Sequence, residues 1–124
     1  MHLSEAEWKI MSVVWTKSPA SARDVCDALH DETAWAYTTV KTMLDRLVEK
    51  GALKAAMKRN ATVYEPRVTQ KDGRRTALRA LLDRAFGGSV APLVHHLLNV
   101  EKLSKRDRAE VERLLRESDE ESAR

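Results

Sequence analysis

Apolar residues recur at helical spacing in three segments within the first fifty residues. Serine and acidic residues with the spacing of a capping box precede the first two stripes, which predict helices over residues 5–16 and 22–30. The third stripe predicts a helix over residues 37–50, closed by Gly51. The stripes comprise Trp8, Met11, Val14 and Trp15, then Val25, Ala28 and Leu29, then Val40, Met43, Leu44, Leu47 and Val48.

The pattern changes after Gly51. Two short runs, residues 52–57 and 61–66, flank a polar tip at residues 58–60. Short extended runs around a basic turn predict a β-hairpin, although the first run is rich in alanine. Three helices followed by a hairpin within about 65 residues predict a winged helix-turn-helix, in which the third helix is the recognition helix.

The second half predicts three more amphipathic helices, which begin after Thr69, Ser89 and Ser104. The polar tail over residues 117–124 is expected to fray. The predicted fold is therefore mainly α with a small β-hairpin wing. It comprises a winged-helix DNA-binding domain over residues 1–69 and a helical dimerisation domain over residues 70–124.

Charge supports a polyanionic partner through its distribution more than through its total. The net charge is only +3, from 22 basic and 19 acidic residues. Residues 41–67 hold seven basic residues against three acidic ones, which is the footprint expected for nucleic acid. Threonines and cations suit a major groove, and a basic hairpin suits the flanking backbone or minor groove. The candidate DNA-binding residues are Thr38, Thr39, Lys41, Thr42, Arg46, Lys58 and Arg59.

Apolar stripes in the second half predict a homodimer, because 55 residues can scarcely build a core of their own. The alternative is that these helices fold back on the N-terminal module. Two linked half-site readers also gain affinity and specificity. The candidate dimerisation residues are Leu78, Leu81, Leu82, Leu93, Leu97, Val111, Leu114 and Leu115.

Other functional classes lack their signatures in the sequence. No apolar run approaches the roughly 18 to 20 residues that span a bilayer, and the N-terminus does not resemble a secretory signal, so a cytoplasmic protein is expected. Cys26 alone cannot form a thiolate metal site, and His95 and His96 diverge on a helix, so no metal or cofactor is expected. No nucleophile–base pair indicates an enzyme. A winged-helix adaptor that binds proteins instead of DNA remains the alternative, because a fold does not fix a function.

Several motifs together resemble the penicillinase-repressor (BlaI/MecI/CopY-type) family of bacterial winged-helix repressors. They are Glu7-Trp8, Ala22-Arg23-Asp24-Val25, the run from Trp35 to Gly51, Tyr64-Glu65-Pro66 and Phe86-Gly87-Gly88-Ser89. The resemblance implies a dimeric transcriptional repressor on a palindromic double-stranded DNA operator in the cytoplasm. It also implies control of β-lactam-resistance or metal-homeostasis genes.

The sequence departs from the family pattern in three places. Ala36-Tyr37 stands where the family often has Ser-Pro, and no cysteine follows Cys26 to form the metal motif of the copper-responsive branch. In the β-lactam branch, a membrane sensor-linked protease triggers cleavage of an Asn-Phe bond in the dimerisation part. The matching bond here is His96-Leu97, which the resemblance marks as the candidate cleavage site.

Overall fold

The helices of the N-terminal half begin where capping groups meet the first amides. The computed structural model, which describes residues 1–123, starts α1 (Glu5–Thr16) after Ser4 and α2 (Ala22–Thr33) after Ser21, each with a capping box. α3 (Tyr37–Lys50) has no side-chain cap and ends at Gly51, whose φ of 85° suits glycine. α1 and α3 match their predicted bounds. α2 continues past its predicted end at residue 30 by one polar turn, to Thr33.

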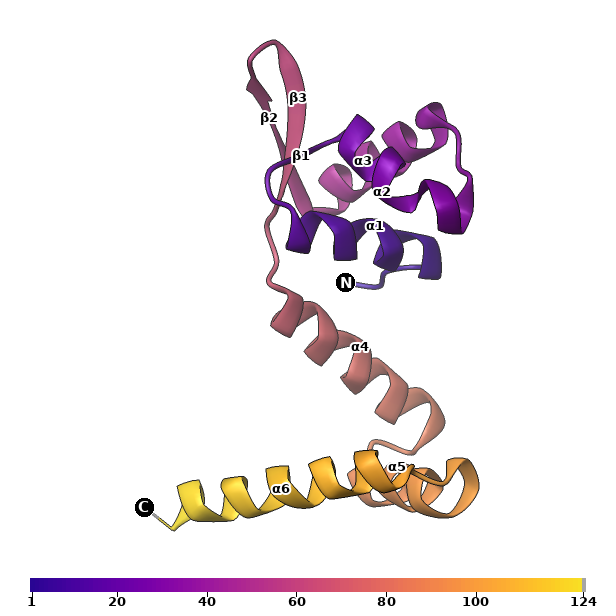
Figure 1. Cartoon of the computed structure of the whole chain (residues 1–124), viewed down its shortest axis with the longest axis vertical. Coiled ribbons are helices and arrows are strands. Elements are labelled where there is room, and N and C mark those ends of the chain that lie inside the picture. Colours follow the sequence, from indigo (N-terminus) through magenta and orange to yellow (C-terminus); the bar gives the residue numbers. More distant parts are fainter. Residues whose placement is uncertain (124) are drawn as a thin grey trace. The chain divides into compact units, whose positions relative to one another are not determined.

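Two strands form the predicted hairpin, and a third strand joins it. β2 (Leu53–Lys58) and β3 (Ala61–Pro66) pair antiparallel, and β1 (Ala20–Ser21) pairs with the other edge of β3. β1 was not predicted, because two residues are too few for an alternating pattern. Figure 1 shows the β2–β3 hairpin extending beyond α1, α2 and α3. The mainly helical fold with a small β wing is thus confirmed.

One apolar core holds α1, α2, α3 and the base of the hairpin together. Its fully buried members come from each of these elements and include Ile10, Val25, Leu44, Leu53 and Tyr64. The three tryptophans, Trp8, Trp15 and Trp35, are partly buried against this cluster. The recognition helix and the wing therefore rest on the same core, which fixes their spacing.

A buried carboxylate ties the start of α1 to the end of α3. Glu7 accepts a hydrogen bond from the Ser4 amide (2.8 Å) and pairs with Lys50 Nζ (2.7 Å). Burial acts to raise the pKa of Glu7, but the hydrogen bonds from Lys50 and Ser4 outweigh it and leave this pKa below its usual value. Lys50 also lies in the last turn of α3, where a cation suits the helix dipole.

α4 (Gln70–Ala85) begins in close contact with α1. Trp15 Nε1 donates to the Val68 carbonyl at 2.9 Å. A Cβ at position 73 would lie 3.1 Å from Trp15 Cη2, so Gly73 allows this close approach. These contacts lie within the first of two structural units, Met1–Arg79, and the second unit begins at Ala80.

The second unit contains the end of α4 and three further helical elements. These are α5 (Val90–His96), the π-helical segment η1 (Leu97–Glu101) and α6 (Lys105–Ser122), for which Ser104 is the N-cap. The prediction that the chain frays from residue 117 was wrong as far as Ser122. This stretch remains in α6, where Arg113 forms an ion pair with Glu117. Among residues 1–123, no helix is long and apolar enough to cross a membrane.

Candidate nucleic-acid interface

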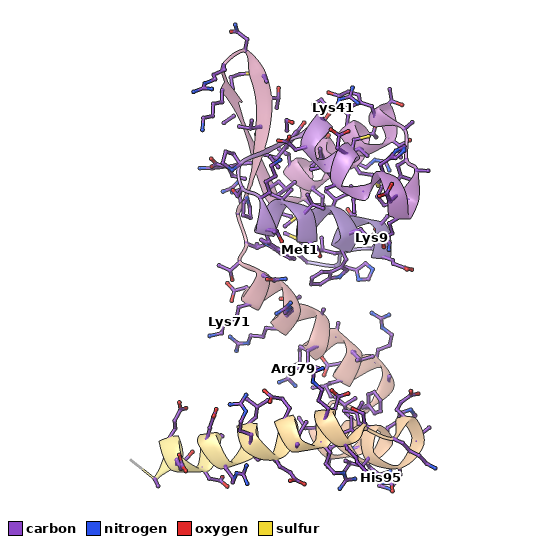
Figure 2. All side chains as sticks on the ribbon, viewed as in Figure 1. Met1, Lys9, Lys41, Lys71, Arg79 and His95 are labelled. Carbon is purple, nitrogen blue, oxygen red and sulfur yellow. The ribbon has the colours of Figure 1, made fainter. Side chains whose placement is uncertain are left out.

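α3 has one buried face and one polar, exposed face. Val40, Leu44 and Leu47 are fully buried and anchor the helix to the core. The opposite face carries the predicted contact residues, and Figure 2 labels Lys41 on this helix. Lys41 is half-buried, and the exposed members are Thr38, Thr39, Thr42 and Arg46. α3 therefore offers short hydroxyls and the Arg46 guanidinium to solvent.

The wing ends in a two-residue turn formed by Arg59 and Asn60. Their φ angles are 52° and 63°, as in the primed turns that suit antiparallel hairpins. Lys58, expected at the tip, is instead the last residue of β2 and pairs with Ala61. Asparagine tolerates the left-handed region well, whereas arginine there is uncommon. Both Lys58 and Arg59 are exposed.

The turn predicts opposite consequences for two neutral replacements of Arg59. Arg59→Gly and Arg59→Val remove the same charge, but only glycine adopts a positive φ at little steric cost. Arg59→Val is therefore expected to have a free energy of unfolding about 1–2 kcal/mol below that of Arg59→Gly. Urea denaturation of the two full-length variants measures this difference. Equal midpoints and slopes would contradict the left-handed turn.

The basic residues of the segment 41–67 form two groups, according to whether a carboxylate lies beside them. Lys41 pairs with Asp45, Lys50 with Glu7 and Lys54 with Glu65. Within residues 1–123, no carboxylate lies within 4.0 Å of the other basic groups of the segment 41–67. These cations are Arg46, Lys58, Arg59 and Arg67. Their charge is available to a partner.

Lys41 belongs to a hydrogen-bonded cluster that connects α3 with β3. Its Nζ donates to Tyr64 Oη (2.5 Å) and Asp45 Oδ1 (3.0 Å), and Tyr64 Oη donates to the same Asp45 oxygen (2.9 Å). Burial acts to raise the pKa of Asp45, but the hydrogen bonds from Lys41 and Tyr64 leave it below its usual value. The hydrogen bonds to Tyr64 and Asp45 raise the pKa of Lys41, which stays charged.

Sequence reasoning missed Tyr64 as a member of this cluster. The i,i+4 spacing of Lys41 and Asp45 signals an ion pair on one helix face. Tyr64 lies on a strand, and only the packing of β3 against the helices places its hydroxyl beside that pair. The sequence offered no local signal for this contact.

The residue pair that departs from the family pattern lies at the start of α3. Ala36 is the N-cap residue and makes no side-chain capping bond, and Tyr37 is exposed. The guanidinium of Arg23, in α2, lies 4.9 Å from the centre of the Tyr37 ring, within the range of a cation–π contact. Arg23 and Tyr37 thus connect α2 with α3 on the exposed side of the helix-turn-helix.

The predicted dimerisation residues are mostly exposed in the single chain. Leu93 is half-buried, and Leu82, at 3% exposure, is buried and contributes no exposed surface. The large apolar side chains left exposed are Leu78, Leu81, Leu97, Val111, Leu114 and Leu115. His96 ends α5 and Leu97 begins η1, so the candidate cleavage bond lies at the change from α to π geometry, and both residues are exposed.

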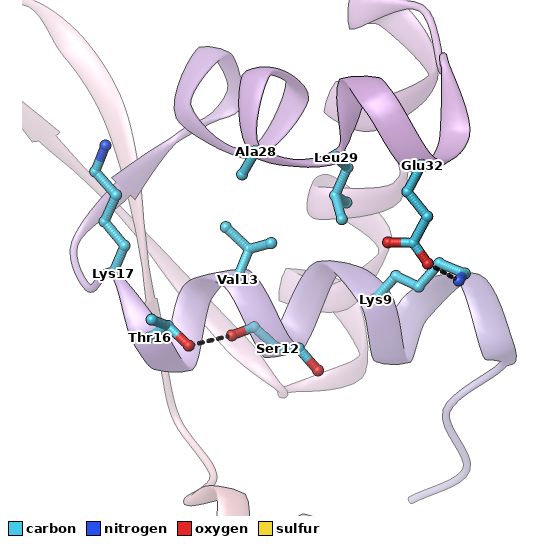
Figure 3. A pocket seen from close by; sticks show the side chains of 8 residues that line it. All are labelled: Lys9, Ser12, Val13, Thr16, Lys17, Ala28, Leu29 and Glu32. Carbon is cyan, nitrogen blue, oxygen red and sulfur yellow. Dashed lines mark hydrogen bonds and ion pairs between the residues drawn. The ribbon is translucent and has the colours of Figure 1, made fainter.

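A groove of about 510 Å³ lies between α1 and α2 and not along α3 (Figure 3). Val13 and Leu29 line it, and Lys9 closes one end through an ion pair with Glu32. Cys26 is buried, with its Sγ near the Trp35 carbonyl. Within residues 1–123, no three His, Cys, Asp or Glu side chains gather as a metal site.

The helix-turn-helix formed by α2 and α3, with its basic hairpin, defines a winged-helix DNA-binding protein. The model of the penicillinase repressor family matches residues 3–117, and the chain belongs to this family. It is 30% identical over 115 residues to the penicillinase repressor of Bacillus licheniformis, covering 93% of this chain and 90% of that protein. It is 25% identical over 113 residues to the methicillin resistance regulatory protein MecI of Staphylococcus aureus, covering 91% of this chain and 92% of that protein.

Solved structures resemble the winged-helix part. The DNA-binding domain of the repressor BlaI matches 57% of this chain and 87% of its own, with 34% identity and a TM-score of 0.52. Bacillus licheniformis BlaI, in its monomeric form in complex with the blaP half-operator, matches 58% of this chain and 88% of its own, with 33% identity and a TM-score of 0.51. The predicted family is confirmed, and the chain is a DNA-binding transcriptional repressor and not an enzyme.

Proposed function

We propose that the chain acts in the bacterial cytoplasm as a homodimer that represses transcription from a palindromic operator. The observation that carries this proposal is the group of cations on α3 and the wing that have no carboxylate partner among residues 1–123. Arg46, Lys58 and Arg59 leave three positive charges per protomer available to phosphates. Such a concentration on a winged-helix scaffold is typical of a DNA-binding surface.

The proposed surface divides its contacts between bases and backbone. The threonines Thr38, Thr39 and Thr42 would meet base edges or thymine methyl groups in the major groove, and Arg46 a guanine or a phosphate. Lys58 and Arg59 would reach the flanking backbone or the minor groove from the wing. Lys41 lies on the same face, although its ammonium is engaged by Asp45 and Tyr64. The half-operator complex of the Bacillus licheniformis relative supports DNA binding by this module.

Exposed apolar residues support the proposed dimer. Val111, Leu114 and Leu115 form a stripe along α6 and are between 42% and 61% exposed. A monomer rarely leaves such a stripe in water, since burying it against a second copy removes apolar surface from solvent. A two-fold dimer would carry two recognition helices and match a palindromic site.

Footprinting on the DNA upstream of its own gene tests the DNA-binding proposal. The purified full-length protein is expected to protect a site with two-fold symmetry, with affinity that falls steeply as salt increases. A random duplex of equal length is the control for specificity. Binding that is absent or insensitive to salt would contradict the proposal and favour the protein-interaction adaptor.

We further propose that the target genes are of the β-lactam-resistance type and that a sensor-linked protease ends repression. The His96-Leu97 bond is exposed and lies between α5 and η1. Cutting it would separate α6, with its apolar stripe, from the rest of the chain. The two half-site readers would then lose the avidity that their linkage supplies, a factor of roughly 10² or more.

Cleavage predicts a defined fragment in the native host. After exposure to a β-lactam, immunoblot and intact mass are expected to show an N-terminal fragment ending between Val94 and Leu98. The untreated culture provides the control, and derepression should follow the fragment in time. Full derepression with the chain intact would contradict this route of release.

A further inference from the structure

The ammonium of Lys41 already uses its hydrogen-bond donors within the protein. An ammonium has three N–H donors, and Nζ already contacts Tyr64 Oη at 2.5 Å and the two oxygens of Asp45 at 3.0 and 3.4 Å. The same Nζ lies 5.3 Å from the centre of the Tyr64 ring, which adds a favourable contact with the π-system. To reach a phosphate, Lys41 would have to give up charge-assisted hydrogen bonds.

Asp45 carries a negative charge on the face that carries the proposed DNA contacts. It lies one residue before Arg46 and is exposed. An unpaired carboxylate there would repel the phosphates of a duplex and weaken the field of Arg46. Lys41 and the Tyr64 hydroxyl surround one Asp45 oxygen, Oδ1, with two donors and so offset this charge.

Tyr64 gives the cluster one rigid member. Its ring is fully buried, and β3 holds it between Ala20 of β1 and Ala55 of β2. Its hydroxyl therefore occupies a fixed position beside α3. An exposed i,i+4 pair alone contributes little, since two mobile side chains must be ordered to form it. A rigid third member reduces that cost.

We infer that Lys41 is a positioning residue, held by Tyr64, that neutralises Asp45 on the recognition helix and does not itself contact the operator. This inference rests on the proposed function and assigns a different role to one residue of that surface. At position 41, α3 then requires a charge that neutralises Asp45 and not a contact between lysine and phosphate. A variant that lacks the charges of both Lys41 and Asp45 should therefore bind DNA as well as the wild type, which has both.

A double-mutant cycle on the full-length protein tests the inference. The probes are a duplex carrying the footprinted site upstream of its own gene and a random duplex of equal length. Lys41→Met is expected to weaken binding about 5- to 10-fold, because Asp45 then faces the phosphates without a neighbouring cation. Lys41→Met combined with Asp45→Asn is expected to return the affinity to within about twofold of the wild type, with an unchanged salt slope.

Asp45→Asn alone provides a gain-of-binding arm. It releases Lys41, so the random duplex should bind more tightly and the salt slope should steepen by about 0.9 per protomer. Lys71→Met, an exposed lysine of α4 outside the cluster, is the matched control for loss of one charge. If the double variant stays as weak as Lys41→Met, with a slope reduced by about 0.9 per protomer, Lys41 contacts phosphate directly and the inference is wrong.

Tyr64→Phe supplies a readout that needs no DNA. It keeps the buried ring and removes only the hydroxyl, so the pKa of Asp45 measured by NMR should rise towards its usual value. An unchanged pKa would overturn the role of Tyr64. Wild-type protein that binds neither duplex would contradict the proposed function itself, which is a different outcome from a double variant that fails to recover.

Discussion

Leu114→Asp is expected to convert the proposed dimer into monomers and to weaken operator binding at least about 100-fold. Leu114 is 51% exposed on the apolar stripe of α6. In a monomer the aspartate would stay in water at little cost. In an apolar interface it would be buried without a partner, twice per dimer, at a cost of several kcal/mol. Sedimentation at micromolar concentration and operator titration measure the two effects.

Ala109→Asp provides the matched control for this prediction. It adds the same charge to α6, about 140° around the helix from Leu114, on the polar side. It is expected to leave both the assembly and the affinity unchanged. Leu114→Asp should still bind a half-site, with about half the salt slope of the dimer on the full site. A variant that remains dimeric would place the interface elsewhere on the chain.

Local signals in the sequence were sufficient for α1, the start of α2, the end of α3 and the hairpin. Capping boxes at Ser4 and Ser21 and the glycine at position 51 set the helix boundaries, and each acts within a few residues. The predicted bounds of α1 were therefore correct, and those of α3 were correct although this helix starts without a side-chain cap. The hairpin was found for the same reason, since its turn and its two runs are neighbours in the chain.

Contacts between distant segments could not be predicted in this way. The strand β1 exists because Ala20 and Ser21 meet the edge of β3, more than forty residues later. Lys41 was placed on the contact surface as a phosphate or base ligand, because its spacing on α3 is visible in the sequence. The hydroxyl that engages it comes from Tyr64, and only the fold reveals that contact.

The apolar stripes of the C-terminal helices predicted only in part which side chains are buried. Helical spacing gave Leu81 and Leu82 the same role, yet Leu81 is exposed and Leu82 is buried in the single chain. Spacing identifies an apolar face but does not say whether the chain itself or a second copy covers it. The interface residues therefore remain a proposal, which Leu114→Asp tests.

Removing the exposed cations of α3 and the wing is expected to abolish specific DNA binding at moderate salt. The combined variant Arg46→Ala, Lys58→Ala and Arg59→Gly deletes three positive charges per protomer, six per dimer, from the proposed surface. If all six contact phosphates, the salt slope should fall by about 5, and the operator affinity by about a thousandfold or more. Glycine at position 59 keeps the left-handed turn unstrained, so this loss is not expected to come from a distorted wing.

The control removes the same number of charges from the other structural unit. Lys105, Arg106 and Arg108 are exposed in the first turn of α6 and are replaced together by alanine. The net charge changes equally, and loss of cations from a helix N-terminus is not destabilising. If operator affinity depended only on the total charge, both triple variants would lose the same affinity. If α3 and the wing contact phosphates, only the first triple variant should lose affinity. Equal losses would therefore reject these contacts and leave only long-range attraction between the repressor and its operator.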